Sequence, residues 1–502
     1  MRAARALRSA AAVVVAVILS ACGGGAAPGG SATGTLHISV ATAPNSFQVG
    51  AWAGGDAVTY LSLYDTIFLR DAEGELQPAI ADAWEYSEDR TQLTLEIRPG
   101  MTFSDGSPVD AAAVAASLEF ARSGPATASN LDSVSSVEAV GDDQVVISLS
   151  APDASLEPAL AGVVGVVGAP GSLDSEESKL SPVASGAYVL DEAATTAGSV
   201  YVLKKNPDHW NADAYPFDTV EVRVIPDPAA VQNAILSGQL DFGAITPDAE
   251  AQFSPAKFTT GTFAPIGLGA IWIADREGTV VPALADARVR QAISLAFDRE
   301  QIGANLDPGR NNPTNQVFNP NGDVFDEAPL ASSYDPERAR ELMAEAGYAA
   351  GFDVTMPSSV ITTQYEAAIS SALGDIGINV TWEAVPVQNY YAQILAKNYG
   401  MFMGIYGFTG SDPQDVKRMT SGIFNPFRLS SPEFQDLMHA VGAVPVEEQP
   451  SALQTVNQYF LDQVWIAPFT FVTGKYAASN AIEYTSLTGT ANGVRPFAPA
   501  GD

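Results

Sequence analysis

The chain has a single cysteine in 502 residues, Cys22, so no disulfide bond within it can hold the fold together. The residues before this cysteine form a leader, in which three arginines precede an apolar run over residues 10–19. A basic segment followed by a short apolar segment is typical of a secretory signal peptide. The run is too short for a membrane-spanning helix, which needs about 20 residues. We therefore expect residues 1–21 to be a signal peptide rather than a buried N-terminal helix.

The residues around Cys22 indicate what this cysteine is for. Leu19-Ser20-Ala21-Cys22 resembles the lipobox of bacterial lipoproteins, in which the thiol receives a diacylglyceryl group and the chain is cut just before it. The resemblance implies a lipid anchor at Cys22 with palmitate among its acyl groups. Two acyl chains hold a protein stably at a membrane, at about 0.8 kcal/mol per buried methylene. Residues 22–34, rich in Gly, Ala and Ser, would then be the lipidated cysteine and a flexible tether with a reach of roughly 20 Å.

The charge of the chain argues against nucleic acid as a partner. Lys and Arg number 25 against 58 Asp and Glu, and the formal net charge is −33. Such a field repels phosphate backbones and anionic headgroups, and we attribute it to solubility on an exposed surface. At about 150 residues per domain, the length after the signal peptide predicts about three domains, or fewer and larger ones.

Hydrophobic patterns predict a mixed α and β body without repeats. The segment 93–97 alternates apolar and polar residues, as a strand does. We expect Ser107 to cap the helix that follows, with a proline at its first position. Two later helices are expected to begin after Asp286 and Asp335, and the second to end at Gly347.

No catalytic or metal-binding motif stands out. The three histidines, His37, His209 and His439, lie far apart in the sequence, and no CxxC or HExxH spacing occurs. Ser254 and Lys257 match S-x-x-K, but the SDN and KTG motifs that complete such a site are missing. We therefore expect no metal, no cofactor and no enzymatic activity, and keep a lipid-anchored hydrolase as an alternative that depends on Ser254 and Lys257.

Two loops combine glycine with aromatic residues. Trp52 lies in a Gly/Ala-rich loop, and residues 406–413 (YGFTGSDP) place two aromatics among glycines after an apolar segment. Glycines let a backbone approach a ligand closely, and aromatics supply flat apolar walls. Core packing with turn glycines explains the same pattern equally well.

Residues 81–120 resemble a signature of the extracellular solute-binding proteins of the oligopeptide, dipeptide and nickel class, which deliver cargo to ATP-driven importers. The shared positions are Trp84, Ser87, Asp89, Arg98-Pro99-Gly100, Phe103, Asp105-Gly106 and Pro108-Val109. Further motifs similar to the family follow in the same order, at residues 204–210, 224–242, 286–300, 334–348 and 464–469. The resemblance covers essentially the whole chain after the tether.

The chain departs from the family where cargo is recognised. In peptide binders of the family, a G-W-x-x-D segment places a carboxylate against the free amine of the peptide. Here Gly407-Phe408-Thr409-Gly410 is followed by Ser411, and Asp412 comes one place late. Asp412 either takes the amine-binding role or corresponds to an Asp-Pro pair that lies downstream in relatives.

The resemblance implies an α/β fold of two lobes around a cleft, with an extra subdomain in the first lobe. We expect cargo to be trapped by closure of the lobes. The expected organisation runs from the signal peptide (1–21) and tether (22–34) to lobe I (35–57), its extra subdomain (58–181), the second part of lobe I (182–270), lobe II (271–469) and a return to lobe I (470–502).

The function implied is that of a lipid-anchored receptor that captures a peptide or peptide-like solute for an ATP-driven importer. Its expected partners are the solute, the permease and ATPase subunits of the importer, and the membrane through the anchor. The protein itself is expected to be a monomer on the extracytoplasmic face of the cell membrane. The same fold with a nickel chelate, a glycan or another small solute is the alternative.

The candidate ligand contacts come from two parts of the chain. Trp52 and Gly54 are chosen for their loop position, and Gly407, Phe408, Thr409 and Asp412 for the motif match.

Overall fold

The computed structural model describes residues 34–52, 57–71, 74–264, 267–306, 312–326, 330, 333–485 and 493–501. The predicted signal peptide and two predicted site residues, Cys22 and Gly54, lie outside these residues. None of the helices in the described ranges has the length and apolar character that crossing a membrane requires.

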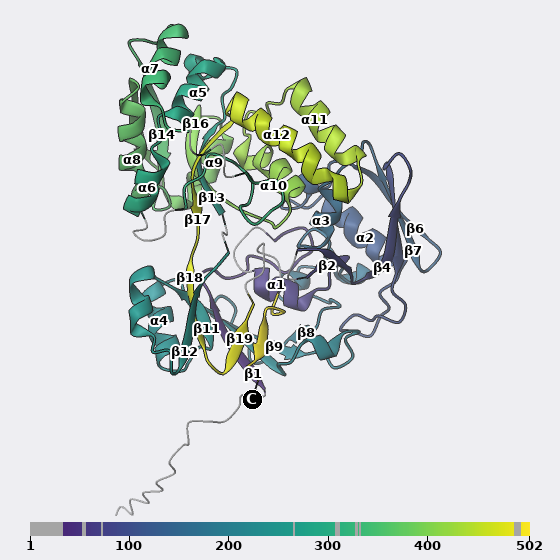
Figure 1. Ribbon diagram of the computed structural model, residues 1–502. Helices are drawn as coiled ribbons and strands as arrows, with labels where there is room; N and C mark the ends of the chain where they lie inside the picture. The colour runs from purple at the N-terminus through teal and green to yellow at the C-terminus, as the bar shows by residue number, and fades with distance from the viewer. Residues whose placement is uncertain are drawn as a thin grey trace, which may run out of the picture.

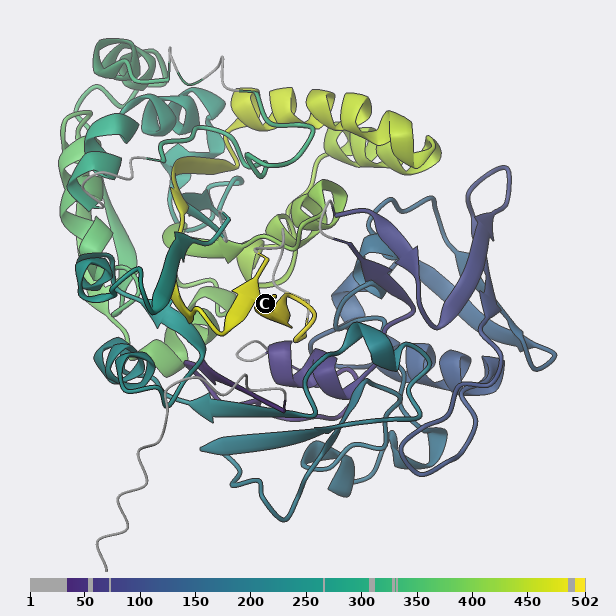
Figure 2. The ribbon, with the colours of Figure 1, turned by 60° about the horizontal axis from the view of Figure 1, so that its bottom comes forward.

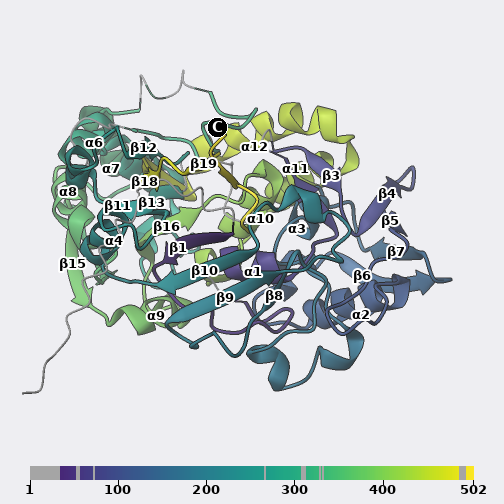
Figure 3. The same ribbon diagram turned by 90° about the horizontal axis from the view of Figure 1, so that it is seen from below.

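In the described part of the chain, the largest sheet has seven strands drawn from three separate regions. Their order is β12 (Phe258–Thr262), β18 (Lys475–Ser479), β11 (Phe242–Ile245), β1 (Thr35–Val40), β10 (Thr219–Val224), β9 (Val200–Lys205) and β8 (Tyr188–Leu190). β1 runs parallel to β10 and β11, with Ile38 opposite Val222, and the remaining pairs are antiparallel. Figure 3 shows β1, β10 and β9 side by side.

Short elements complete the body around this sheet. They are α1 (Ala57–Leu63), α4 (Pro228–Leu236), the pair β2 (Phe68–Arg70) and β3 (Leu76–Pro78), and the pair β19 (Ile482–Tyr484) and β20 (Phe497–Pro499). α4 packs on β11 through Val231 and Ile235. In Figure 2 the C-terminal strands, drawn in yellow, lie beside the purple N-terminal part of the chain.

A second sheet in the described residues has four antiparallel strands. Its order is β4 (Ala81–Tyr86), β5 (Gln92–Ile97), β7 (Gln144–Leu149) and β6 (Val134–Val140), and α2 (Ala111–Arg122) packs on β6 and β7. The predicted cap of α2 is wrong: Asp110 accepts from Ala113 N, whereas the Ser107 hydroxyl donates to Asp105 at 2.6 Å. Asp105 forms a local turn with Ser107, so the helix begins three residues later than a Ser107 cap would place it.

A third sheet, within the described ranges, consists of β16 (Met401–Gly407), β13 (Gly267–Ile273) and β17 (Ile466–Val472), all antiparallel. Every residue of β13 is buried, because both faces of this sheet are covered. Successive side chains of a strand alternate between the faces, so Ala270 and Trp272 join one apolar cluster while Ile271 and Ile273 join another.

Helices enclose this third sheet. On the side of Ile271 lie α5 (Ala287–Leu295), α6 (Arg299–Leu306), α7 (Pro336–Glu345) and α8 (Thr363–Gly374), with the parallel pair β14 (Phe352–Ser358) and β15 (Ile378–Ala384). On the side of Trp272 lie α9 (Tyr390–Leu395), α10 (Asp412–Met419), α11 (Pro432–Ala443) and α12 (Gln449–Gln463). The predicted caps are confirmed, since Asp286 accepts from Arg288 N and Asp335 from Arg338 N.

The chain passes twice between the seven-stranded and three-stranded sheets, from β12 to β13 and from β17 to β18 (Figure 1). The predicted boundaries after residues 270 and 469 fall within β13 and β17, near these crossings, and stay predictions. The four-stranded sheet lies at the opposite end of the molecule from α6, α7 and α8 (Figures 1 and 3).

Candidate functional site

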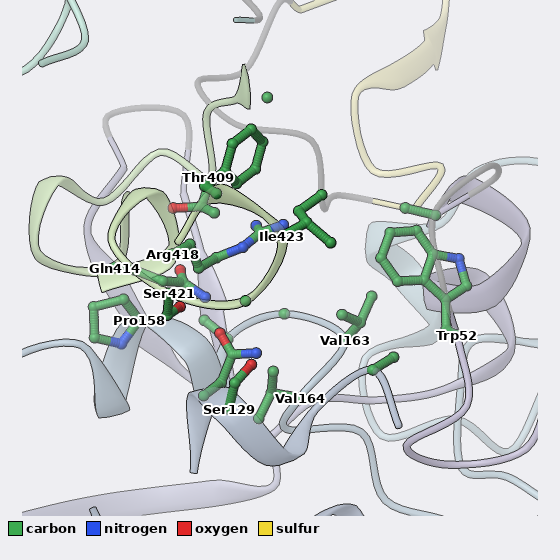
Figure 4. Close-up of a pocket in the computed structure, with 18 of the residues that line it drawn as sticks. Trp52, Ser129, Pro158, Val163, Val164, Thr409, Gln414, Arg418, Ser421 and Ile423 are labelled. Atoms are coloured by element: carbon green, nitrogen blue, oxygen red, sulfur yellow. The ribbon is translucent and has the colours of Figure 1, made fainter. Parts of the chain in front are cut away.

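Two adjacent hollows form a cleft between α3 (Leu156–Leu160) and α10, and they share Arg70 and Pro158. The first, which we call the arginine hollow, has a volume of about 340 Å³. Its lining residues are Trp52, Ala57, Arg70, Ala126, Ser129, Asn130, Pro158, Ala161, Gly162, Val163, Val164, Gly407, Thr409, Gln414, Arg418, Ser421, Gly422, Ile423 and Phe424 (Figure 4). Pockets of roughly 300–1,000 Å³ are typical of small-molecule sites.

The second hollow, which we call the acidic hollow, has a volume of about 670 Å³. The carboxylates on its wall belong to Glu75, Glu157, Asp323, Asp412 and Glu447. Asn319, Asn321, Gly322, Gly410 and Ser411 also line it. The two hollows therefore differ in charge, although they meet at Arg70.

Segments far apart in the sequence supply the two walls. The loop with Trp52, the end of β2 and the region around α3 form one wall, and the end of β16, the loop after it and α10 form the other. Arg70 crosses between them, because its Nη1 donates to the carbonyl oxygens of Gly74 and Gly410, each at 3.0 Å. The site is thus complete only when the two walls are close together.

Asp415 holds the loop between β16 and α10 in place. One of its oxygens, Oδ1, accepts hydrogen bonds from Thr409 N at 2.8 Å, Thr409 Oγ1 at 2.7 Å and Tyr406 Oη at 2.8 Å. Asp415 is 1% exposed. Burial raises the pKa of Asp415 to about 6, and the hydrogen bonds from Thr409 and Tyr406 oppose this rise. Asp415 therefore shapes the wall that presents Gly407 and Thr409 to the arginine hollow.

Asp412 lies at the first position of α10 and faces the acidic hollow. Burial raises the pKa of Asp412 to about 7; the charges of Asp415 and Asp323 add to the rise, and a hydrogen bond with the Asn319 backbone opposes it. Gly322 packs directly on this carboxyl group, because a Cβ there would lie 2.8 Å from Asp412 Oδ2. The Asp412 carboxyl group is thus confined, and it titrates near neutral pH.

Ion pairs and hydrogen bonds join the two walls outside the hollows. Lys417 Nζ on α10 lies 2.7 Å from both Asp132 Oδ1 and Asp153 Oδ2, which belong to the part of the chain around the four-stranded sheet. Arg90, beside the same sheet, donates from Nε to the carbonyl oxygen of Gly442 on α11 at 2.9 Å. The structure therefore shows the two sides of the cleft tied together.

The predicted site residues divide into three groups. Trp52, Gly407 and Thr409 line the arginine hollow, and Asp412 lines the acidic hollow. Phe408 lines neither: it is 0% exposed, and its ring centroid lies 6.0 Å from that of Tyr406 and 6.1 Å from that of Phe471. Gly54 lies outside the described residues.

Four residues of the site were not predicted from the sequence: Arg70, Gln414, Asp415 and Arg418. Gln414 and Arg418 are four residues apart on α10, so helical spacing predicts that they share a face, and this signal was available. For Arg70 no local pattern was available, because its contact with Gly410 spans 340 residues.

Residues 75–423 match the family model described as bacterial extracellular solute-binding proteins, family 5 Middle. The glutathione-binding protein GsiB of Escherichia coli (strain K12) is 26% identical over 331 residues, 64% of this chain, and the match spans 64% of that relative's own length. GsiB of Pectobacterium atrosepticum is 24% identical over 456 residues, which cover 85% of this chain and 86% of the relative.

Solved structures with the same fold are known. The binding protein AgaA from A. tumefaciens R10 in complex with agropinic acid has a TM-score of 0.79 and 21% identity, covering 93% of this chain and 99% of that one. NikA from Brucella suis in complex with Fe(III)-EDTA has a TM-score of 0.76 and 20% identity over the same shares. The predicted two-lobed α/β fold is confirmed.

Proposed function

The chain belongs to family 5 of the bacterial extracellular solute-binding proteins, and we propose on that premise that it captures a small solute in the cleft and delivers it to an ATP-driven importer. The observation that supports this proposal is the cleft itself, whose walls come from segments joined by an arginine across 340 residues. Such a site needs no covalent chemistry. Closure around the solute only has to favour the liganded state through its differential affinity.

A peptide or peptide-like solute is the leading candidate. The curated relatives in Escherichia coli and Pectobacterium atrosepticum are named for glutathione. Opposite charges at the two ends of the cleft suit a solute with both an anionic and a cationic end, as a free peptide has.

A non-peptide solute is the second candidate. Ser411 stands where the resemblance to peptide binders leads us to expect the amine-binding carboxylate, and Asp412 is one residue further on. Structures of the same fold hold agropinic acid and Fe(III)-EDTA. A hydrolase gains no support, because Ser254 is exposed just before a turn and neither it nor Lys257 is among the residues that line the two hollows.

Native mass spectrometry of gently purified protein tests the proposed function. We expect a fraction of the protein to carry a noncovalent adduct with the mass of a small solute, since closed receptors of this kind retain cargo. The same preparation is then screened by thermal shift against peptides, opines, metal chelates and glycans. No adduct and no stabilisation by any member of the panel would contradict the proposed function.

Lipid anchoring at Cys22 is part of the proposal, and the variant Cys22→Ser tests it. Without the thiol no diacylglyceryl group can be attached, so most of the protein should wash off membranes, whereas the wild type stays bound. Membrane fractionation with a high-salt wash measures this. The anchor assignment fails if the variant remains membrane-bound.

Lys417 gives a test of closure that leaves the hollows intact, because it lines neither of them. Burial acts to lower the pKa of Lys417, but the charges of Asp153 and Asp132 outweigh burial, so the pKa is raised and the side chain stays charged. Replacing it with methionine leaves Asp153 without this partner and loosens the closed state. We expect Lys417→Met to raise the dissociation rate of bound solute about tenfold.

The control for Lys417→Met is Lys179→Met, which removes an exposed pair with Glu176. Stopped-flow measurement of solute release compares both variants with the wild type. Equal release rates for Lys417→Met and the wild type would show that the ion pairs do not hold the cleft closed.

A further inference from the structure

We propose that the solute carries an anionic group, a carboxylate in the simplest case, which binds between Arg70 and Arg418 in the arginine hollow. This inference rests on the proposed function, and it names the chemical class of the solute. It also orients the solute: because the arginine hollow adjoins the acidic hollow at Arg70, the anionic end lies in the first and the rest can extend towards the second.

The charged side chains on the lining of the arginine hollow are both cationic. Arg70 and Arg418 supply two guanidinium groups, and none of the described residues that line this hollow is Asp or Glu. This is unusual in a chain with a net charge of −33. Asp415, behind the wall, acts electrostatically on both arginines, and Glu75 of the acidic hollow acts on Arg70. Because Oδ1 of Asp415 is held by Tyr406 and Thr409, the two cations still meet no carboxylate on the lining of the hollow, which favours an anionic occupant.

Arg70 has one guanidinium nitrogen that is hydrogen-bonded to the protein and one that is not. Nη1 is held by the carbonyl oxygens of Gly74 and Gly410, so the position of the guanidinium is fixed by both walls. Nη2 is buried and has no hydrogen-bond partner among the described residues. A buried donor without a partner is costly, and an acceptor atom on the solute would satisfy it.

Arg418 and Gln414 supply further hydrogen-bond donors from α10. Arg418 is exposed, and its guanidinium carbon lies 5.7 Å from the centroid of the Tyr406 ring. Its charge acts on the buried Asp415, but no ion pair within 4 Å joins it to another of the described residues. Gln414 lies one helical turn earlier on the same wall. Figure 4 shows the two side chains close together, near Thr409 and Ser421. A carboxylate can therefore receive donors from a guanidinium and an amide on one helix face, and from Arg70.

The rest of the arginine hollow fits the apolar part of such a solute. Trp52, Val163 and Val164 lie on one wall, and Ile423 lies on the other. In Figure 4 Trp52 faces the hollow from the side opposite Arg418. An acid with an apolar or aromatic neighbour group is thus expected here, and any cationic group of the same solute would point towards Asp412.

The test pairs each acid with its neutral derivative. Glutathione, the dipeptide Ala-Phe and agropinic acid are titrated by calorimetry beside their carboxamides or methyl esters, using wild type, Arg418→Met, Arg418→Lys and Arg70→Met. At least one acid should bind, and its neutral derivative should bind at least tenfold more weakly. Arg418→Met should remove this preference, and Arg418→Lys should restore part of it. Arg338→Met, which alters an exposed arginine on α7, is the control and should leave the preference unchanged.

The outcomes separate this inference from the proposed function. Equal affinity for an acid and its ester, or binding of neutral or cationic solutes alone, would overturn the anionic class while the receptor function stands. If no panel member binds, the solute released by denaturing the purified protein decides: an acid supports the inference, and a molecule without an anionic group overturns it. If nothing binds and nothing is released, the proposed function fails, and this inference fails with it.

Discussion

Replacing Phe408 with alanine is expected to lower the free energy of unfolding by about 3–5 kcal/mol, the range typical of buried Phe-to-Ala substitutions. The side chain is 0% exposed and packs between Tyr406 and Phe471 in the apolar cluster beneath the β16–α10 loop. Phe408 was predicted from the sequence to contact the solute, but it lies behind the wall of the cleft. Urea-induced unfolding of the wild type and the variant measures the change.

Phe424 is the matched control for Phe408. Its ring centroid lies 5.4 Å from that of Tyr406, but it is half-buried and lines the arginine hollow. We expect Phe424→Ala to cost less stability than Phe408→Ala and to lower solute affinity more. A variant Phe408→Ala with near wild-type stability and a tenfold loss of affinity would show that Phe408 contacts the solute after all.

Asp412→Asn is expected to lower the affinity for a free-amine peptide at least tenfold at pH 8, with little effect on the N-acetylated peptide. A charge-assisted hydrogen bond is worth roughly 1.5–3 kcal/mol, and about 1.4 kcal/mol is a factor of ten. The substitution keeps the shape of the side chain and removes its charge. Calorimetric titration of both peptides against both proteins measures the effect, with Asp353→Asn, an exposed change on β14 outside both hollows, as the control.

The pH dependence of Asp412 follows from the direction of its shift. The pKa of Asp412 is raised to about 7, so a nearby cation would favour the charged form, and binding should strengthen as the pH rises through 7. In the unliganded protein the raised pKa favours the neutral form. Ionising Asp412 in the folded protein therefore lowers the free energy of unfolding, and this loss develops as the pH rises from about 4, the pKa in the unfolded chain, to about 7.

Asp412→Asn removes this pH-dependent loss of stability. The difference in unfolding free energy between variant and wild type should therefore grow over the same interval and stay constant above it. Equal affinities of the two proteins for the free-amine peptide would contradict the amine-binding role. Asp412 would then be a helix-start residue before Pro413, in a turn that aspartate favours.

The fold could be predicted from the sequence because its signals are local. The caps at Asp286 and Asp335 depend on a side chain and an amide two or three residues away, and such contacts are visible as spacing. Ser107 shows the limit of such reasoning. The same hydroxyl can cap a helix or join an Asp105 turn, and the sequence did not decide between them.

The site was only partly predictable, because it is assembled from distant segments. Gly407, Thr409 and Asp412 were identified through the motif after β16, and Trp52 through its loop. Arg70 joins the site through Gly410, and the charge contrast between the hollows arises only when both walls come together. A sequence cannot show that Phe408 points into the core while its neighbours face the cleft.

A crystal structure of the protein with the solute that co-purifies with it would test the central claim most directly. We predict one small molecule between the loop with Trp52 and the β16–α10 loop, with an acidic group on Arg70 and Arg418. Any cationic group of the molecule should lie near Asp412. A solute bound elsewhere on the protein, with the cleft empty, would contradict this assignment of the site.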